Sequence, residues 1–241
     1  MSAKLIGIGV GPGDPELLTL KAVRALEAAD VVAHFAKNGN SSNARAVVAS
    51  QLRPEATELE FRYPVTTEMP HHSSAYCSLI AAFYDECACE IAAHLDAGRS
   101  VAVLCAGDPL FYGSYMHLHA RLAPHYQTEV IAGVTGMSGC WSAAGLPIAQ
   151  GDDVFTVVPA TLPETELTRR VSEADSAVII KLGRNLAKVR RALDKAKRLE
   201  RAIYVERGTM RNSVVMQLTA KQDEEAPYLA VVLVPGWAAR A

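Results

Sequence analysis

Short apolar segments that end in glycine-containing turns recur along this chain, and they constrain its fold more than any other feature. Residues 5–10 (LIGIGV) end in the turn of residues 9–14, which has three glycines, and residues 101–105 (VAVLC) lead into residues 106–109 (AGDP). Between these segments, residues 17–29 carry apolar side chains at helical spacing, and residues 73–97 form a long helical stretch before Gly98. Strands that alternate with helices predict a parallel sheet covered by helices, which is the α/β class.

The second half of the chain mixes this alternation with an antiparallel pattern. Two predicted strands at its end flank residues 206–210, which contain Gly208 and are typical of a hairpin loop. We therefore expect two α/β domains, residues 1–135 with a mainly parallel sheet and residues 136–241 with a mixed sheet. The strands predicted in this half are residues 154–158, 177–181, 201–205, 213–217 and 228–234, and its helices are residues 137–144, 164–173 and 186–198.

Charge and composition argue against several classes of partner and location. The formal net charge is −2, so the chain as a whole has no electrostatic attraction to nucleic acid or to a membrane surface. No apolar run approaches the roughly 20 residues that span a bilayer, and the first residues do not resemble a signal peptide. The count of five cysteines is odd, which argues against a disulfide framework. We expect a cytoplasmic protein.

The first glycine turn does not match the common nucleotide-binding motifs. Gly9, Gly11 and Gly13 lack the G-x-G-x-x-G spacing of dinucleotide-binding proteins, and Pro12 and Pro15 disturb the entry to the following helix. The pattern that ends in Gly-Lys-Ser/Thr is absent as well. NAD is therefore weakly supported and ATP or GTP more weakly, and each turn taken alone could be a tight connection from strand to helix.

Asp108 is the sharpest single candidate in these turns. It directly follows a buried strand and precedes a proline. Its carboxylate could cap the following turn, or it could contact a polar ligand at the carboxyl end of the sheet. We predict no metal site, because Cys87 and Cys89 would diverge on a helix and the adjacent His71 and His72 are more typical of an exposed loop.

Five segments in order resemble the tetrapyrrole methylase family, which includes methyltransferases that act on precorrins, on uroporphyrinogen III and on diphthine precursors. The segments are GIGVGPGDPELLT, CAGDPLFYGS, AGVTGMSGCWSAAGLPI, KLGRN and VERGTM, and together they extend over nearly the whole chain. Within the family, the sequences GDPLFYGSYMHLH and KLGRNLAKVRRAL are similar to the branch that methylates C20 of precorrin-2. The resemblance implies two α/β domains with a cofactor cleft between them, and a homodimer.

The resemblance also implies S-adenosylmethionine as the cofactor and S-adenosylhomocysteine as its product. Only positions that match the family motifs are carried over. Many relatives have Thr-Ala where this chain has Thr135-Gly136, and glycine still permits backbone contact there. The implied cofactor-binding residues are Val10, Ala106, Gly107, Asp108, Phe111, Thr135, Gly136, Leu182 and Gly208.

The expected reaction is methylation of precorrin-2 at C20 to give precorrin-3A in cobalamin biosynthesis. Such a substrate is a large, flat macrocycle with eight carboxylates, so it needs cations and apolar walls. The candidate substrate-binding residues are Tyr112, Lys181, Arg184, Arg207 and Arg211, and the sequence names no catalytic base. Alternatives are cobalt-precorrin-2, another tetrapyrrole, a protein or RNA substrate, and a nucleotide-binding module without catalysis.

Overall fold

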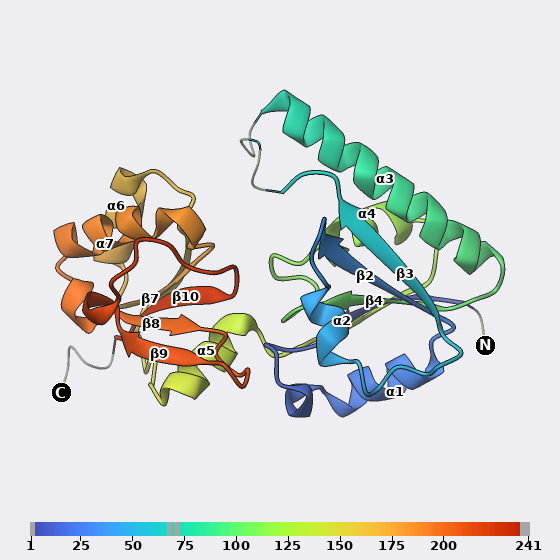
Figure 1. Ribbon diagram of the computed structural model, residues 1–241, viewed down its shortest axis with the longest axis horizontal. Helices are drawn as coiled ribbons and strands as arrows, with labels where there is room; N and C mark the ends of the chain where they lie inside the picture. Colours follow the sequence, from blue (N-terminus) through green and yellow to red (C-terminus); the bar gives the residue numbers. More distant parts are fainter. Residues whose placement is uncertain (1–2, 67–68, 70–72, 237–241) are drawn as a thin grey trace. The chain divides into compact units, whose positions relative to one another are not determined.

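The chain divides into two compact units, residues 1–135 and 136–241. The computed structural model describes residues 3–66, 69 and 73–236 (Figure 1). Each unit contains a five-stranded sheet with helices on both faces. The predicted α/β class, with two α/β sheets, is confirmed. Among the described residues, no helix has both the length and the apolar character that crossing a bilayer requires.

The sheet of the first unit was predicted to be mainly parallel, and it is entirely parallel. Its strand order is β3-β2-β4-β1-β5, so β1 lies between β4 and β5. All carboxyl ends of these strands therefore lie along one edge. The strands are β1 (Leu5–Gly9), β2 (Val31–Lys37), β3 (Thr57–Tyr63), β4 (Val101–Cys105) and β5 (Thr128–Ile131).

Helices cover both faces of this sheet. Figure 1 shows α3 and α4 over one face and α1 and α2 over the other. Successive side chains of β1 point to opposite faces of the sheet, since Leu5 packs with α3 and α4 whereas Ile6 packs with α1 and α2. The helices are α1 (Leu20–Ala28), α2 (Asn43–Val47), α3 (Ser74–Asp96) and α4 (Tyr115–Leu122).

The first helix begins later than its apolar spacing predicted. Residues 17–29 were expected to be helical, but Pro15–Leu17 form a short 3-10 turn (η1) and α1 begins at Leu20. The reason is a cap at Thr19, whose hydroxyl oxygen accepts a hydrogen bond from the Ala22 N–H at 3.1 Å. Leu20, which the spacing placed on the buried face, is 75% exposed.

The sheet of the second unit is mixed, and the predicted hairpin is confirmed. Its strand order is β6-β7-β10-β8-β9; β6 and β7 are parallel, and β8 and β9 are antiparallel. Both β7 and β8 are antiparallel to β10, so they run in the same direction and the loops that follow them lie at the same edge. The strands are β6 (Phe155–Pro159), β7 (Ser176–Ile180), β8 (Ile203–Glu206), β9 (Val214–Gln217) and β10 (Ala230–Val234).

Helices α6 and α7 cover one face of this second sheet and α5 covers the other. Glu164 at the start of α6 joins the first pair, because its carboxylate contacts Arg191 at 2.9 Å and Lys195 at 2.6 Å on α7. The helices are α5 (Gly136–Ala144), α6 (Glu164–Glu173) and α7 (Leu186–Lys195), with short 3-10 turns at η2 (Gly183–Asn185), η3 (Leu199–Arg201) and η4 (Leu218–Ala220).

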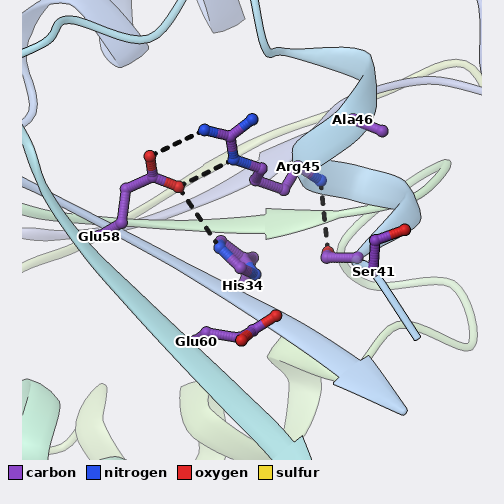
Figure 2. Close-up of a pocket in the computed structure, with 7 residues that line it drawn as sticks. His34, Ser41, Arg45, Ala46, Glu58 and Glu60 are labelled. Atoms are coloured by element: carbon purple, nitrogen blue, oxygen red, sulfur yellow. Dashed lines mark hydrogen bonds and ion pairs between the residues drawn. The ribbon is translucent and has the colours of Figure 1, made fainter. Parts of the chain in front are cut away.

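One buried histidine of the first unit lies in a polar cavity beside α2 (Figure 2). His34 lies on β2 opposite Glu60 of β3, and its Nε2 is 3.5 Å from a carboxylate oxygen of Glu58. Glu58 also accepts two hydrogen bonds from Arg45, each 2.9 Å long. Burial lowers the pKa of His34 below its ordinary 6.5, although the carboxylates of Glu60 and Glu58 act in the opposite direction.

The buried His34 predicts a loss of stability in mild acid. The unfolded chain binds the proton more readily than the folded chain, so the free energy of unfolding should fall as the pH drops below 6.5. We expect His34→Gln to remove up to about 1 kcal/mol of the loss between pH 7.5 and pH 5.5. Urea unfolding at several pH values measures how the free energy of unfolding changes with pH, with the exposed His125→Gln as the control. The same pH dependence in His34→Gln as in the wild type would contradict the role given to His34.

Candidate functional site

Three glycine-containing loops of the first unit meet at the carboxyl ends of β1, β4 and β5. The Gly107 N–H donates to the carbonyl of Gly11 at 2.8 Å, which joins the loops after β4 and β1. A Cβ atom at Gly9 would lie 2.5 Å from the backbone nitrogen of Gly133, and a Cβ at Gly133 would lie 2.2 Å from the carbonyl oxygen of Gly107. The three backbones therefore pack directly on one another, which glycine alone permits.

The carboxylate of Asp108 holds two of these loops. One oxygen accepts a hydrogen bond from the Leu110 N–H at 2.9 Å, and the other accepts from the Gly133 N–H at 3.2 Å. The structure thus places Asp108 in the capping role that the sequence left open, and adds a link to the loop after β5. Val10, Ala106 and Gly107, predicted for the cofactor, lie in the same group of loops. Gly133 is absent from the predicted set, although it lies in the segment AGVTGMSGCWSAAGLPI that carries the family resemblance.

The loop that follows Asp108 exposes three large apolar side chains in succession. Leu110 is 50%, Phe111 36% and Tyr112 49% exposed. The rings of Phe111 and Tyr112 meet edge to face at 4.9 Å. Tyr112 has a φ of 55°, a left-handed conformation that is unusual for a residue with a side chain. An exposed apolar group on a loop with a strained backbone is typical of a binding site.

The predicted cofactor residues of the second unit contribute mainly backbone. The side chain of Leu182 is 1% exposed and belongs to the core beneath α6 and α7, so only its main chain is available to a ligand. Gly208 is crowded, since a Cβ there would lie 2.9 Å from the thiol of Cys140. Gly136 begins α5 and has open space around its Cα, so the alanine of many relatives would fit. Thr135, which precedes it, is partly buried.

The predicted cations gather at one edge of the second sheet. Lys181 and Arg184 follow β7, and Arg207 and Arg211 follow β8, which runs in the same direction. Burial lowers the pKa of Lys181. Arg207 contacts the Glu206 carboxylate and donates to the Asn212 carbonyl at 3.2 Å.

Two of these cations share an unusual backbone conformation with Tyr112. Lys181 has a φ of 58° and Arg207 a φ of 51°. In the described part of the chain only one other non-glycine residue, Lys197, has a positive φ. Left-handed conformations at residues with side chains cost about 1–3 kcal/mol and gather at functional sites. Three of the five residues predicted to bind substrate are therefore held in strained conformations.

The buried thiols are unsuited to act as nucleophiles. Burial raises the pKa of Cys87 and Cys105 to about 12 and that of Cys140 to about 11. These thiols stay protonated at neutral pH, and a thiolate is the reactive form. Within residues 3–66, 69 and 73–236, no group of three or more His, Cys, Asp or Glu side chains is arranged to hold a metal ion. His71 and His72 lie outside the described residues.

Comparison with known proteins shows clear relatives. The family model described as Tetrapyrrole (Corrin/Porphyrin) Methylases matches residues 4–222. A precorrin-2 C(20)-methyltransferase of Sinorhizobium sp. is 60% identical over 97% of this chain and 96% of that protein. A cobalt-precorrin-2 C(20)-methyltransferase of Salmonella typhimurium is 25% identical over 97% of each chain.

A solved structure shares the fold. It is a uroporphyrin-III C-methyl transferase from Thermus thermophilus, complexed with S-adenyl homocysteine. Its TM-score is 0.68 at 23% identity, and the alignment covers 98% of this chain and 99% of that one.

Proposed function

Because the chain belongs to the family of tetrapyrrole (corrin/porphyrin) methylases, we propose that it transfers a methyl group from S-adenosylmethionine to C20 of precorrin-2, giving precorrin-3A. The observation that carries this assignment is the 60% identity, over 97% of the chain, to a precorrin-2 C(20)-methyltransferase. The exposed aromatic loop after β4 and the cations after β7 and β8 support it, since a flat polycarboxylate needs both.

The glycine loops suit S-adenosylmethionine. The close packing of Gly9 and Gly133 on each other and on Gly107 gathers the main chain of three loops at the carboxyl ends of β1, β4 and β5, where ligands bind in open α/β sheets. Asp108 holds two of these loops through backbone hydrogen bonds. We assign the cofactor contacts to Val10, Ala106, Gly107, Asp108, Phe111, Thr135, Gly136, Leu182 and Gly208.

The protein's contribution to the reaction is orientation. When bound, S-adenosylmethionine supplies a methyl group that is already electrophilic. An electron-rich carbon of the tetrapyrrole must be held in line with the sulfur–methyl bond, and positioning alone can contribute several kcal/mol. Tyr112 would contact the ring face, whereas Lys181, Arg184, Arg207 and Arg211 would pair with carboxylates.

The metal-free tetrapyrrole is preferred as substrate over its cobalt complex. The relative named for precorrin-2 is 60% identical and the relative named for cobalt-precorrin-2 is 25% identical. The test is transfer of a labelled methyl group to precorrin-2 with and without cobalt. We expect a single methyl to be added, with the metal-free substrate preferred. No transfer to either substrate would reject the proposed function.

We further assign the protein to the cytoplasm as a homodimer. Light scattering of the purified full-length chain should then give twice the monomer mass of 25.8 kDa. A monomer at micromolar concentration would reject the homodimer.

A further inference from the structure

We propose that a hydrogen bond between Tyr63 and Ser114 fixes the loop that carries Tyr112, so that Tyr63 is a positioning residue for the tetrapyrrole. Tyr63 is the last residue of β3, and Ser114 directly precedes α4. Their side-chain oxygens are in direct hydrogen-bond contact. The inference rests on the proposed function, because it assigns Tyr63 a part in binding that substrate.

Tyr63 is a firm anchor for such a bond. Its ring stacks on Phe35 at 5.5 Å and packs against Phe83 at 5.1 Å. Its hydroxyl lies 3.4 Å from that of Tyr84, whose pKa burial raises. The Tyr84 hydroxyl therefore remains protonated at neutral pH. A side chain packed on several sides moves little.

Ser114 is diverted from the role that its position predicts. A serine at the start of a helix ordinarily accepts a hydrogen bond from a backbone N–H of the first turn. Ser114 occupies the cap position of α4 but makes no such bond, and its hydroxyl contacts Tyr63 instead. The backbone of Ser114 is helical, with φ −64° and ψ −27°, and not extended as in a capping serine, so its hydroxyl serves the tertiary contact with Tyr63.

The loop between Asp108 and Ser114 is braced at both ends. At its start, Asp108 bonds the Leu110 N–H through its carboxylate, and its carbonyl accepts from the Phe111 N–H at 3.3 Å. At its end, Gly113 is tightly packed, since a Cβ there would lie 2.7 Å from the carbonyl oxygen of Pro109. Tyr112, with its positive φ, lies next to the end that Ser114 and Tyr63 hold.

The two braces act on different parts of the loop. Loss of the Tyr63 bond leaves the contacts of Asp108 to Leu110 and Phe111 in place. It weakens the hold on the part next to Ser114, to which Tyr84 also hydrogen-bonds, and Tyr112 is held there in a strained conformation. Removing the Tyr63 hydroxyl should therefore impair binding of the tetrapyrrole while affecting S-adenosylhomocysteine little.

Single variants and a double-mutant cycle between Tyr63 and Tyr112 test this proposal. We expect Tyr63→Phe and Ser114→Ala, each as a single variant, to raise KM for precorrin-2 about five- to tenfold, the effect of one lost hydrogen bond. The Kd for S-adenosylhomocysteine should change less than twofold, and Ser114→Thr, which keeps the hydroxyl, should retain a near-normal KM. Tyr112→Ala should raise KM as well, and Tyr63→Phe should add nothing to it in the double variant.

Tyr126→Phe is the matched control, because it removes a hydroxyl that donates to Asp96 at 2.9 Å. It should leave KM unchanged. Chymotryptic cleavage after Tyr112, which needs no substrate, should be faster in Tyr63→Phe and Ser114→Ala than in the wild type. A normal KM in Tyr63→Phe, or effects of Tyr63→Phe and Tyr112→Ala that multiply, would overturn the proposal. Failure of the wild type to methylate precorrin-2 would instead reject the proposed function, and with it the contact between Tyr112 and the tetrapyrrole. The same rate of chymotryptic cleavage in the variants as in the wild type would show that the bond between Tyr63 and Ser114 does not hold the loop.

Discussion

Replacement of Asp108 by asparagine is expected to weaken binding of S-adenosylhomocysteine by about 10- to 100-fold. The two carboxylate oxygens accept from the N–H groups of Leu110 and Gly133, and asparagine offers a single acceptor. Its NH₂ group would face one of these donors, so either the turn after Asp108 or the link to the loop after β5 is lost. Hydrogen bonds to charged groups contribute about 1.5–3 kcal/mol, which corresponds to this loss of affinity.

Isothermal titration with S-adenosylhomocysteine measures the effect of Asp108→Asn. Asp30→Asn is the matched control, because Asp30 also accepts a backbone hydrogen bond, from the Ser100 N–H at 2.8 Å. Asp30 precedes β2 and so lies at the opposite edge of the sheet, away from the glycine loops. Binding should survive in Asp30→Asn. Wild-type affinity in Asp108→Asn would show that the loops do not depend on this carboxylate.

Replacement of Gly133 by alanine should affect both stability and binding. The added Cβ would lie 2.2 Å from the carbonyl oxygen of Gly107 and 2.8 Å from the backbone of Gly9. These obstacles are main chain, so the loops themselves must separate. Overpacking of this kind lowers the free energy of unfolding by about 1–3 kcal/mol. The protein should also bind S-adenosylhomocysteine at least about tenfold more weakly, because each displaced loop loses about one hydrogen bond to the ligand.

The stability effect of Gly133→Ala is measured as a fall in Tm. Gly136→Ala provides the control for stability, because no atom lies within 4 Å of the added Cβ. Gly136 is the first residue of α5, where alanine favours helix by up to about 1 kcal/mol. Its Tm should be unchanged or higher. An equal fall in Tm for both variants would argue against the packing of the three loops.

Several elements could be predicted closely because their signals are local. Residues 73–97 were predicted as a helix and α3 spans Ser74–Asp96, since the Ser73 hydroxyl caps the Tyr76 N–H at 3.2 Å and Gly98 adopts a φ of 78° after its end. Strand β3 was missed, although Leu59, Phe61 and Tyr63 alternate with polar residues. It is an edge strand, and pairing with β2 is what makes it extended.

The sequence by itself determined the strand–turn–helix alternation, the glycine turns and the family, because each depends on neighbouring residues or on ordered motifs. Only the tertiary structure decided how those turns are used. The sheet order brings the loops after β1, β4 and β5 together, so Gly133 packs on Gly107 and Asp108 reaches the Gly133 N–H. Tyr63 and Ser114 are 51 residues apart, and they meet because β3 and the loop after β4 end at the same edge of a parallel sheet. Contacts over such separations depend on strand order, which no local period encodes.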